Sequence, residues 1–214
     1  MAENTLQAPA VNQEVAALRT SPVGHLAEKM AAGSVSGERG VALRELPFLT
    51  QIGLRAAQGS ASARALETAL GIELPRSVGQ VSGNEQLSLL WQSPDEFLLV
   101  GPPDSVDTTV LAAVLGRGED ALPGSVIDLS ANRTTLELSG PSARSVLEKG
   151  CHYDLHPSAF TPGHAVSTAL GPVPVLLWKT TEDTYRIMPR ASFADYTAHW
   201  LLDAMAEFAA AEVA

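Results

Sequence analysis

Residues 62–67, Ser-Ala-Arg-Ala-Leu-Glu, return with one insertion at residues 142–148 as Ser-Ala-Arg-Ser-Val-Leu-Glu. Each copy follows a glycine-containing turn, and each places aliphatic residues on one face of a predicted helix. The two helix starts lie about 80 residues apart, which is room for one small folding unit written twice. This duplication is the feature that predicts the fold.

Further matches follow in the same order along the chain. Leu89-Leu90-Trp91 corresponds to Leu176-Leu177-Trp178, and an acidic turn precedes Phe97 as another precedes Tyr185. A series of matches in one order is difficult to attribute to chance. The second copy carries a longer loop, since its tryptophan follows its helix start at a greater distance.

Hydrophobic periodicity predicts a strand–helix–strand–strand–helix order in each copy. In the first copy we expect strands at 47–56, 87–92 and 96–100, and helices at 63–70 and after 104. In the second we expect strands at 126–129, 134–138, 173–178 and 185–188, and helices from 142 and at 193–208. The predicted class is α+β, with two ferredoxin-like βαββα repeats packed together.

Three segments are expected: an N-terminal arm at 1–40, a first repeat at 41–122 and a second repeat at 123–214. The arm is rich in Ala, Ser, Gly and Gln and cannot bury much apolar surface by itself. We therefore expect it to be flexible or bound along a partner.

The balance of charge excludes several kinds of partner. The chain has 14 basic and 24 acidic residues, a net charge of −10, which argues against nucleic acid and against an anionic membrane. A single cysteine, Cys151, excludes an internal disulfide and favours a reducing compartment. With no signal-peptide pattern and no membrane-length apolar run, the expected location is the cytoplasm.

Four residues whose side chains can bind a metal ion or act in catalysis lie close together in the sequence: Cys151, His152, His156 and His164. They are zinc-ligand types, but their spacing lacks the two short pairs typical of structural zinc sites. We therefore expect exposed or hydrogen-bonded histidines. Cys151 follows a predicted helix end, where the dipole raises the pKa of a thiol, so a buried small residue is expected rather than a nucleophile.

Nucleotide and acyl-transfer motifs do not appear: we find no G-x-S-x-G elbow, dinucleotide loop or P-loop. The polar run from Asp128 to Arg133 favours a turn held by Asx-type hydrogen bonds over a ligand contact. Arg190 precedes the last predicted helix and could receive an anion or a partner carboxylate there.

The segment 126–148, with its Asp-Leu-Ser, strand and Gly-Pro-Ser-Ala-Arg helix start, resembles folate-binding aminomethyltransferase-like proteins. Asp-Leu-His-Pro at 154–157 and Ser-Phe-Ala-Asp-Tyr at 192–196 are similar to the gamma-subunit family of heterotetrameric sarcosine oxidase. Leu-Pro-Phe-Leu-Thr-Gln-Ile at 46–52 and Trp-Leu-Leu-Asp-Ala at 200–204 extend the likeness over most of the chain beyond the arm.

This resemblance implies a non-catalytic subunit of an oxidoreductase that converts sarcosine, O2 and tetrahydrofolate to glycine, H2O2 and methylenetetrahydrofolate. It implies alpha, beta and delta partner subunits, with FAD, FMN, NAD and tetrahydrofolate held by the larger ones and zinc by the smallest. This chain is expected to hold no cofactor or metal and to act in assembly and stability during sarcosine catabolism. The alternative is a free-standing folate-binding or aminomethyltransferase-like protein.

No catalytic residue is transferred from the family to this sequence. The expected contacts with a partner are His152, His156, His164, Arg190, Phe193 and Tyr196.

Overall fold

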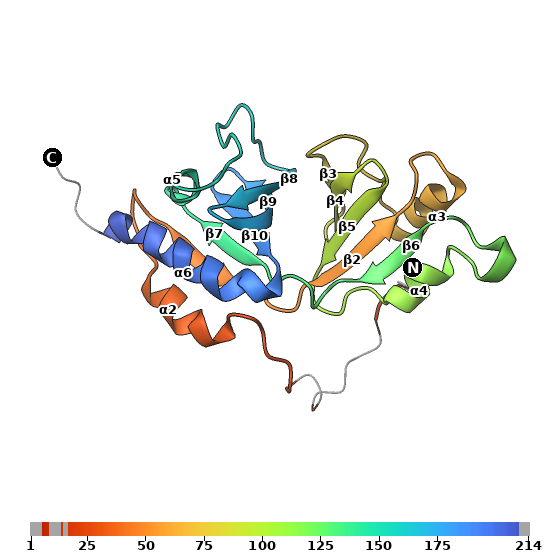
Figure 1. Ribbon diagram of the computed structural model, residues 1–214, viewed down its shortest axis with the longest axis horizontal. Helices are drawn as coiled ribbons and strands as arrows, with labels where there is room; N and C mark the ends of the chain where they lie inside the picture. The colour runs from red at the N-terminus through yellow and green to blue at the C-terminus, as the bar shows by residue number, and fades with distance from the viewer. Residues whose placement is uncertain (1–5, 9–13, 15–16, 210–214) are drawn as a thin grey trace. The chain divides into compact units, whose positions relative to one another are not determined.

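The computed structural model describes residues 6–8, 14 and 17–209. It separates into two compact units: unit 1 comprises residues 1–19 and 48–131, and unit 2 comprises residues 20–47 and 132–214. Each unit has one five-stranded antiparallel sheet with helices against it (Figure 1). The predicted α+β class is confirmed.

Unit 1 contains a sheet in the order β3-β4-β5-β2-β6. Its elements are β2 (Thr50–Arg55), α3 (Ala61–Leu70), β3 (Val81–Gly83), β4 (Ser88–Ser93), β5 (Glu96–Gly101), α4 (Thr108–Ala113), the 3-10 turn η2 (Gly118–Asp120) and β6 (Ser125–Asp128). Leu66 of α3 and Leu111 of α4 pack with Leu54 and Leu99 of the sheet in one apolar core. Burial of these aliphatic faces holds the helices on the sheet.

Local capping sets where the helices of unit 1 begin and end. The Ser60 side chain accepts a hydrogen bond from the Ala63 N–H at 3.1 Å, and Gly71 ends α3 in the left-handed conformation at φ 65°. The Asp107 carboxylate accepts from the Thr109 N–H at 2.7 Å and so starts α4. The α4 helix therefore begins at Thr108, four residues after Asp104, where the sequence predicts its start.

Unit 2 contains a sheet in the order β1-β7-β10-β9-β8. Its elements are η1 (Gly24–Leu26), α2 (Ala27–Ala32), β1 (Ala42–Glu45), β7 (Leu136–Ser139), α5 (Ala143–Glu148), β8 (His164–Leu170), β9 (Val173–Thr181), β10 (Thr184–Pro189), η3 (Ala191–Phe193), α6 (Ala194–Met205) and η4 (Ala206–Ala209). Leu147 of α5 and Leu201 of α6 lie in one core with Leu138 and Ile187 of the sheet. The helices therefore cover the same sheet face.

The duplication extends to the strand order. Read from β6, the sheet of unit 1 runs β6-β2-β5-β4-β3. Read from β1, the sheet of unit 2 runs β1-β7-β10-β9-β8, so corresponding strands occupy corresponding places. Trp91 in β4 and Trp178 in β9 fall on matching strands. Three strands were not indicated by the periodicity: β3 in unit 1, and β1 and β8 in unit 2.

The two repeats exchange their first strands. Strand β1 precedes β2 in the chain but pairs with β7, with Ala42 opposite Ser139. Strand β6 precedes β7 but pairs with β2, with Ile52 opposite Asp128. The compact units therefore do not coincide with the repeats expected at 41–122 and 123–214, because periodicity tells which residues face a core but not which strand lies alongside.

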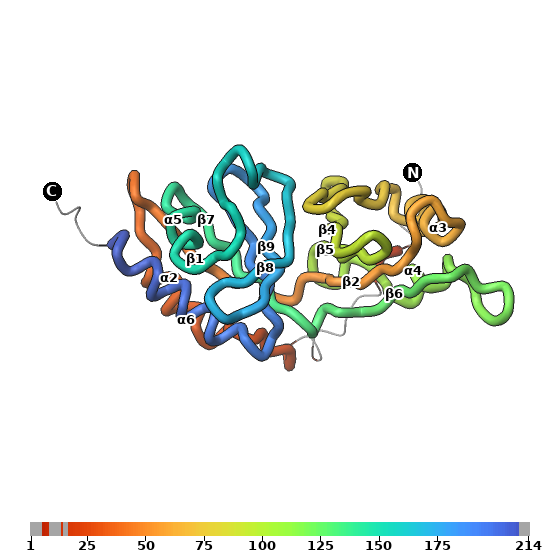
Figure 2. The backbone as a smooth tube through the Cα atoms, turned by 45° about the horizontal axis from the view of Figure 1, so that its top comes forward, coloured from red at the N-terminus to blue at the C-terminus, as the bar shows by residue number. Residues whose placement is uncertain are grey.

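Part of the predicted arm belongs to the core of unit 2. Val23, Leu26 and Met30 are buried there, spaced so that they share one side of η1 and α2. Helix α2 lies beside α6 in both views (Figures 1 and 2), and the His25 ring bonds the Asp195 carboxylate at 2.9 Å. The expectation of a flexible or partner-bound arm at 1–40 is therefore corrected for residues 23–32. Residues 1–5, 9–13 and 15–16 lie outside the described residues.

Candidate partner interface

The thiol of Cys151 is half-buried in the segment that joins α5 to β8. Burial raises the pKa of this thiol, and hydrogen bonds from the Tyr153 backbone and the Thr168 side chain offset the effect only in part. At neutral pH the group is therefore mostly a protonated thiol, a weak nucleophile. The direction matches the prediction from sequence, although its leading cause is burial rather than a helix dipole.

Alkylation of Cys151 tests this placement. We expect iodoacetamide to modify the folded chain several-fold more slowly at neutral pH than the same chain in urea, since less thiolate is present and access is restricted. As the pH is raised, the alkylation rate of the folded chain should still increase at pH values where the alkylation rate of the unfolded chain has reached its plateau. The chain has one cysteine, so adduct mass reports this site alone. Equal rates in the two states would contradict the placement.

His164 begins β8 and packs among aromatic rings. Its ring centroid lies 5.4 Å from that of Phe160 and 6.4 Å from that of Tyr153. Burial lowers the pKa of His164, so its imidazole is neutral near pH 7. The His164 ring thus packs inside unit 2. It is half-buried, whereas His152 and His156 are exposed, so it is the least accessible of the three histidines expected at a partner contact.

His152 and His156 are exposed on the same segment. The His156 Nδ1 atom lies 2.7 Å from the Ser158 hydroxyl, and the His152 backbone N–H donates to the Ala169 carbonyl at 3.2 Å. Across residues 6–8, 14 and 17–209, no three His, Cys, Asp or Glu side chains are placed to hold a metal ion. The Cys151 thiol and the His156 ring each have a hydrogen-bonding partner within unit 2.

A buried ammonium fixes this segment to the sheet. Lys179 on β9 is 1% exposed, and its Nζ donates to the Phe160 carbonyl at 3.1 Å and to the Glu182 carboxylate at 3.2 Å. Sequence reasoning did not single out Lys179, because lysine is rarely buried. The position of Lys179 in the strand could have indicated its burial, because residues two apart in a strand face the same side and Leu177 is buried.

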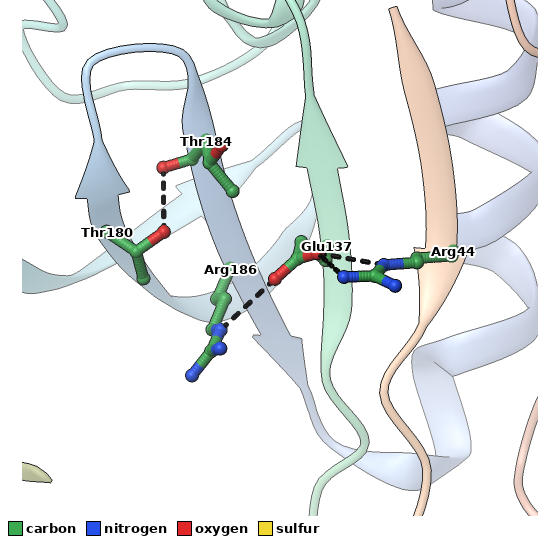
Figure 3. A network of polar contacts seen from close by, with 5 residues as sticks. All are labelled: Arg44, Glu137, Thr180, Thr184 and Arg186. Carbon is green, nitrogen blue, oxygen red and sulfur yellow. Dashed lines mark hydrogen bonds and ion pairs between the residues drawn. The ribbon is translucent and has the colours of Figure 1, made fainter. Parts of the chain in front are cut away.

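Charged side chains form a row across the other face of the same sheet (Figure 3). Arg44 of β1, Glu137 of β7 and Arg186 of β10 are direct cross-strand neighbours. Arg44 donates to Glu137 Oε1 at 2.8 Å through Nε, and Arg186 donates to Oε2 at 3.5 Å. The Arg186 guanidinium also lies 4.9 Å from the centre of the Trp178 ring. Both carboxylate oxygens are thus occupied, which suits a structural role.

Replacing Glu137 with alanine should lower the free energy of unfolding by about 1–2 kcal/mol, because two guanidinium groups lose their shared acceptor. Arg44 is 70% exposed, so water compensates for part of the loss. Glu148→Ala is the matched control: Glu148 meets Arg144 at 3.6 Å on the exposed side of α5, and we expect a loss below about 0.5 kcal/mol. Urea unfolding measures both, and equal losses would contradict this reading of the row.

The start of the last helix presents side chains to solvent. Arg190 is the N-cap residue of η3, and its carbonyl accepts from the Phe193 N–H at 2.8 Å. Phe193 is 43% exposed and Tyr196 is 49% exposed. Of the large apolar side chains exposed in the described part of the chain, these two are the aromatic ones. Arg190, Phe193 and Tyr196 therefore lie together, apart in sequence from the histidine segment.

The polar run at 128–133 is a turn, as its sequence predicts. The Ser130 N–H donates to Asp128 Oδ1 at 2.8 Å, which is an Asx-type bond, and the Ser130 hydroxyl accepts from the Gln51 N–H at 3.0 Å. The polar groups of Asp128 and Ser130 are used inside unit 1, whereas the Arg133 guanidinium donates to the Met188 carbonyl in unit 2. Among the described residues, no helix has the length and apolar character needed to cross a bilayer.

The chain is similar in fold to two solved structures. Aminomethyltransferase T of the glycine cleavage system from Bartonella henselae aligns with a TM-score of 0.60 at 19% identity, over 86% of this chain and 57% of that one. The fold is thus of the aminomethyltransferase class, as the sequence resemblance implied. The chain also aligns with a chain of the heterotetrameric sarcosine oxidase from Corynebacterium sp. U-96 in complex with pyrrole 2-carboxylate. That TM-score is 0.87 at 51% identity, over 92% of this chain and 100% of the other.

Relatives and a family model agree with that alignment. The model of the sarcosine oxidase, gamma subunit family matches residues 55–207. Sarcosine oxidase subunit gamma of Arthrobacter sp. is 52% identical over the full length of both chains, and that of Corynebacterium sp. (strain U-96) is 51% identical over 92% of this chain and 95% of its own. The chain belongs to the sarcosine oxidase gamma subunit family.

Proposed function

We propose that this chain is the gamma subunit of a heterotetrameric sarcosine oxidase and acts in the assembly and stability of that complex. The observation that carries the proposal is the whole-chain likeness to a chain of such an enzyme, at 51% identity and a TM-score of 0.87. The surroundings of Cys151, His156 and His164 support a role outside the chemistry, since each is engaged by neighbours in its own unit.

In this role the complex oxidises sarcosine with O2 to glycine and H2O2, and with tetrahydrofolate it forms methylenetetrahydrofolate. The partners are alpha, beta and delta subunits in the cytoplasm. FAD, FMN, NAD and tetrahydrofolate belong to the larger partners and zinc to the smallest.

The contacts with partners are proposed at two surfaces of unit 2. One is the start of the last helix, with Arg190, Phe193 and Tyr196; the other is the histidine segment, with His152, His156 and, more buried, His164. Exposed aromatic side chains are enriched at protein interfaces, and this supports the helix start as the stronger candidate.

Co-expression with the other subunits tests the proposal. A tagged copy of this chain should retain the alpha, beta and delta subunits through affinity and size-exclusion steps, and native mass should correspond to one copy of each. An untagged chain with tagged alpha subunit is the reciprocal control. A stable monomer that ignores those subunits, and shows saturable tetrahydrofolate binding, would favour the free-standing folate-binding alternative.

A further inference from the structure

Three exposed side chains follow at three-residue spacing where β10 leads into the last helix. Arg190 precedes η3, Phe193 ends it, and Tyr196 lies in the first turn of α6. Phe193 and Tyr196 are three residues apart where η3 continues into α6, and residues three apart on a helix are surface neighbours. Arg190 lies directly before η3 as its extended N-cap residue, and we call these three exposed residues the strip. Two half-exposed aromatic side chains three residues apart are the kind of surface that proteins use for contacts with other proteins.

Positive charge gathers beside this strip, although the chain as a whole carries −10. Arg133 lies opposite Arg190 in an isolated antiparallel bridge. Burial and the nearby charge of Arg190 together lower the pKa of Arg133. Alternation along the strands places Arg44 and Arg186 on the same side of the sheet, where Glu137 is their shared carboxylate. Arg133 and Arg190 thus bring two guanidinium groups to the strip, where the acidic neighbour is Asp195, whose carboxylate bonds the His25 ring.

Arg190 is exposed to solvent. Within the described part of the chain, it makes no hydrogen bond or ion pair, whereas Arg44 and Arg186 share Glu137. Two neighbouring cations raise the local potential, which favours an incoming anion and disfavours another cation. The surface is therefore complementary to a carboxylate next to an apolar side chain.

We infer that the strip of Arg190, Phe193 and Tyr196 docks an acidic segment of a partner subunit, in which a carboxylate pairs with Arg190 and an apolar side chain covers the two rings. The inference rests on the proposed role in a complex and adds the chemistry of the partner. An arginine and aromatic rings in one patch match the composition of interface hot spots.

A zero-length crosslink in the assembled complex tests this pairing. In Arg190→Lys the charge is kept and an amine is supplied; a water-soluble carbodiimide then joins that amine to an adjacent carboxylate as an amide, and the carbodiimide leaves as its urea. The chain has only three lysines of its own, so crosslinked peptides are readily assigned. We expect a product that joins position 190 to an Asp or Glu of a partner subunit.

Arg76→Lys is the matched control, since Arg76 is also exposed, at 71% of its side chain, but lies in unit 1. It should give no crosslink to a partner. In a second measurement, Arg190→Glu should weaken association about tenfold or more and flatten its dependence on salt, while Arg76→Glu should leave both unchanged.

The outcomes separate the inference from the proposed function. If the wild-type complex assembles but position 190 gives no partner crosslink and Arg190→Glu associates as the wild type does, the docking surface is wrong and the subunit role stands. If the wild-type chain does not assemble with the other subunits, both fail together. A crosslink from position 190 to a residue of this chain alone would also overturn the docking surface.

Discussion

Gly140→Ala is expected to lower the free energy of unfolding by about 3 kcal/mol or more. Gly140 has φ 115°, a conformation that alanine adopts only under strain. A Cβ at this position would lie 2.5 Å from the Gly40 carbonyl oxygen and 3.0 Å from its carbon, and both are backbone atoms that cannot swing away. The Gly140 N–H donates to the Asp183 carbonyl at 2.9 Å, so the same turn joins β7 to the β9–β10 hairpin.

Gly163→Ala is the matched control for this glycine. Gly163 also has a positive φ, 80°, but a Cβ there would meet no atom within 4 Å. We expect that variant to lose only about 1 kcal/mol, from backbone strain alone. Urea unfolding followed by tryptophan fluorescence compares the two. If both variants lost the same amount, the close approach of the 40 and 140 backbones would not be the reason that glycine is needed.

The double variant Phe193→Asp and Tyr196→Asp is expected to weaken association with partner subunits by about 3 kcal/mol, roughly a hundredfold. It removes two exposed rings and adds negative charge where we infer an acidic partner segment. The fold should be retained, because both positions are exposed and acidic residues are tolerated in the first turn of a helix. Surface-immobilised partner subunits measure the affinity, and circular dichroism checks the fold.

Val78→Asp controls for the loss of an exposed apolar side chain elsewhere. Val78 is 68% exposed in unit 1, and we expect its replacement to leave association unchanged. Equal affinity of the wild type and the Phe193, Tyr196 double variant would remove the helix start from the interface. Equal weakening by Val78→Asp would show a general effect of added charge rather than a local contact.

The fold class could be predicted because local signals agreed with each other. The Ser-Ala-Arg helix starts at 62 and 142 became α3 and α5, and the apolar runs around Trp91 and Trp178 became β4 and β9, which hold corresponding places in the two sheets. Strong periodicity and a repeated order carry that information without reference to the rest of the chain.

The partners of β1 and β6 could not be predicted in the same way. Each is a strand of four residues at the edge of its sheet, and hydrophobic alternation over four residues does not specify a neighbour. The burial of part of the arm could not be predicted either. Three apolar residues, Val23, Leu26 and Met30, do not indicate a buried helix until the surface that they cover is known.

Arg190, Phe193 and Tyr196 were singled out from sequence, and all three are exposed in the structure. Their contact with a partner subunit stays a prediction. The pairing of Arg133 with Arg190 had no local signal, because it joins two segments more than fifty residues apart. Lys179 was missed for a different reason, since the usual preference of lysine for solvent is overridden by a carbonyl and a carboxylate within reach.

The role in assembly is tested most directly by two quantities measured on the same samples: the yield of assembled complex and the sarcosine turnover per assembled complex. The samples are the wild-type chain, the Phe193, Tyr196 double variant and a Cys151→Ser, His156→Ala variant. We predict that the double variant lowers the yield, and that turnover per assembled complex is the same in all three samples. A fall in turnover per complex at unchanged yield in the Cys151, His156 variant would contradict a non-catalytic subunit.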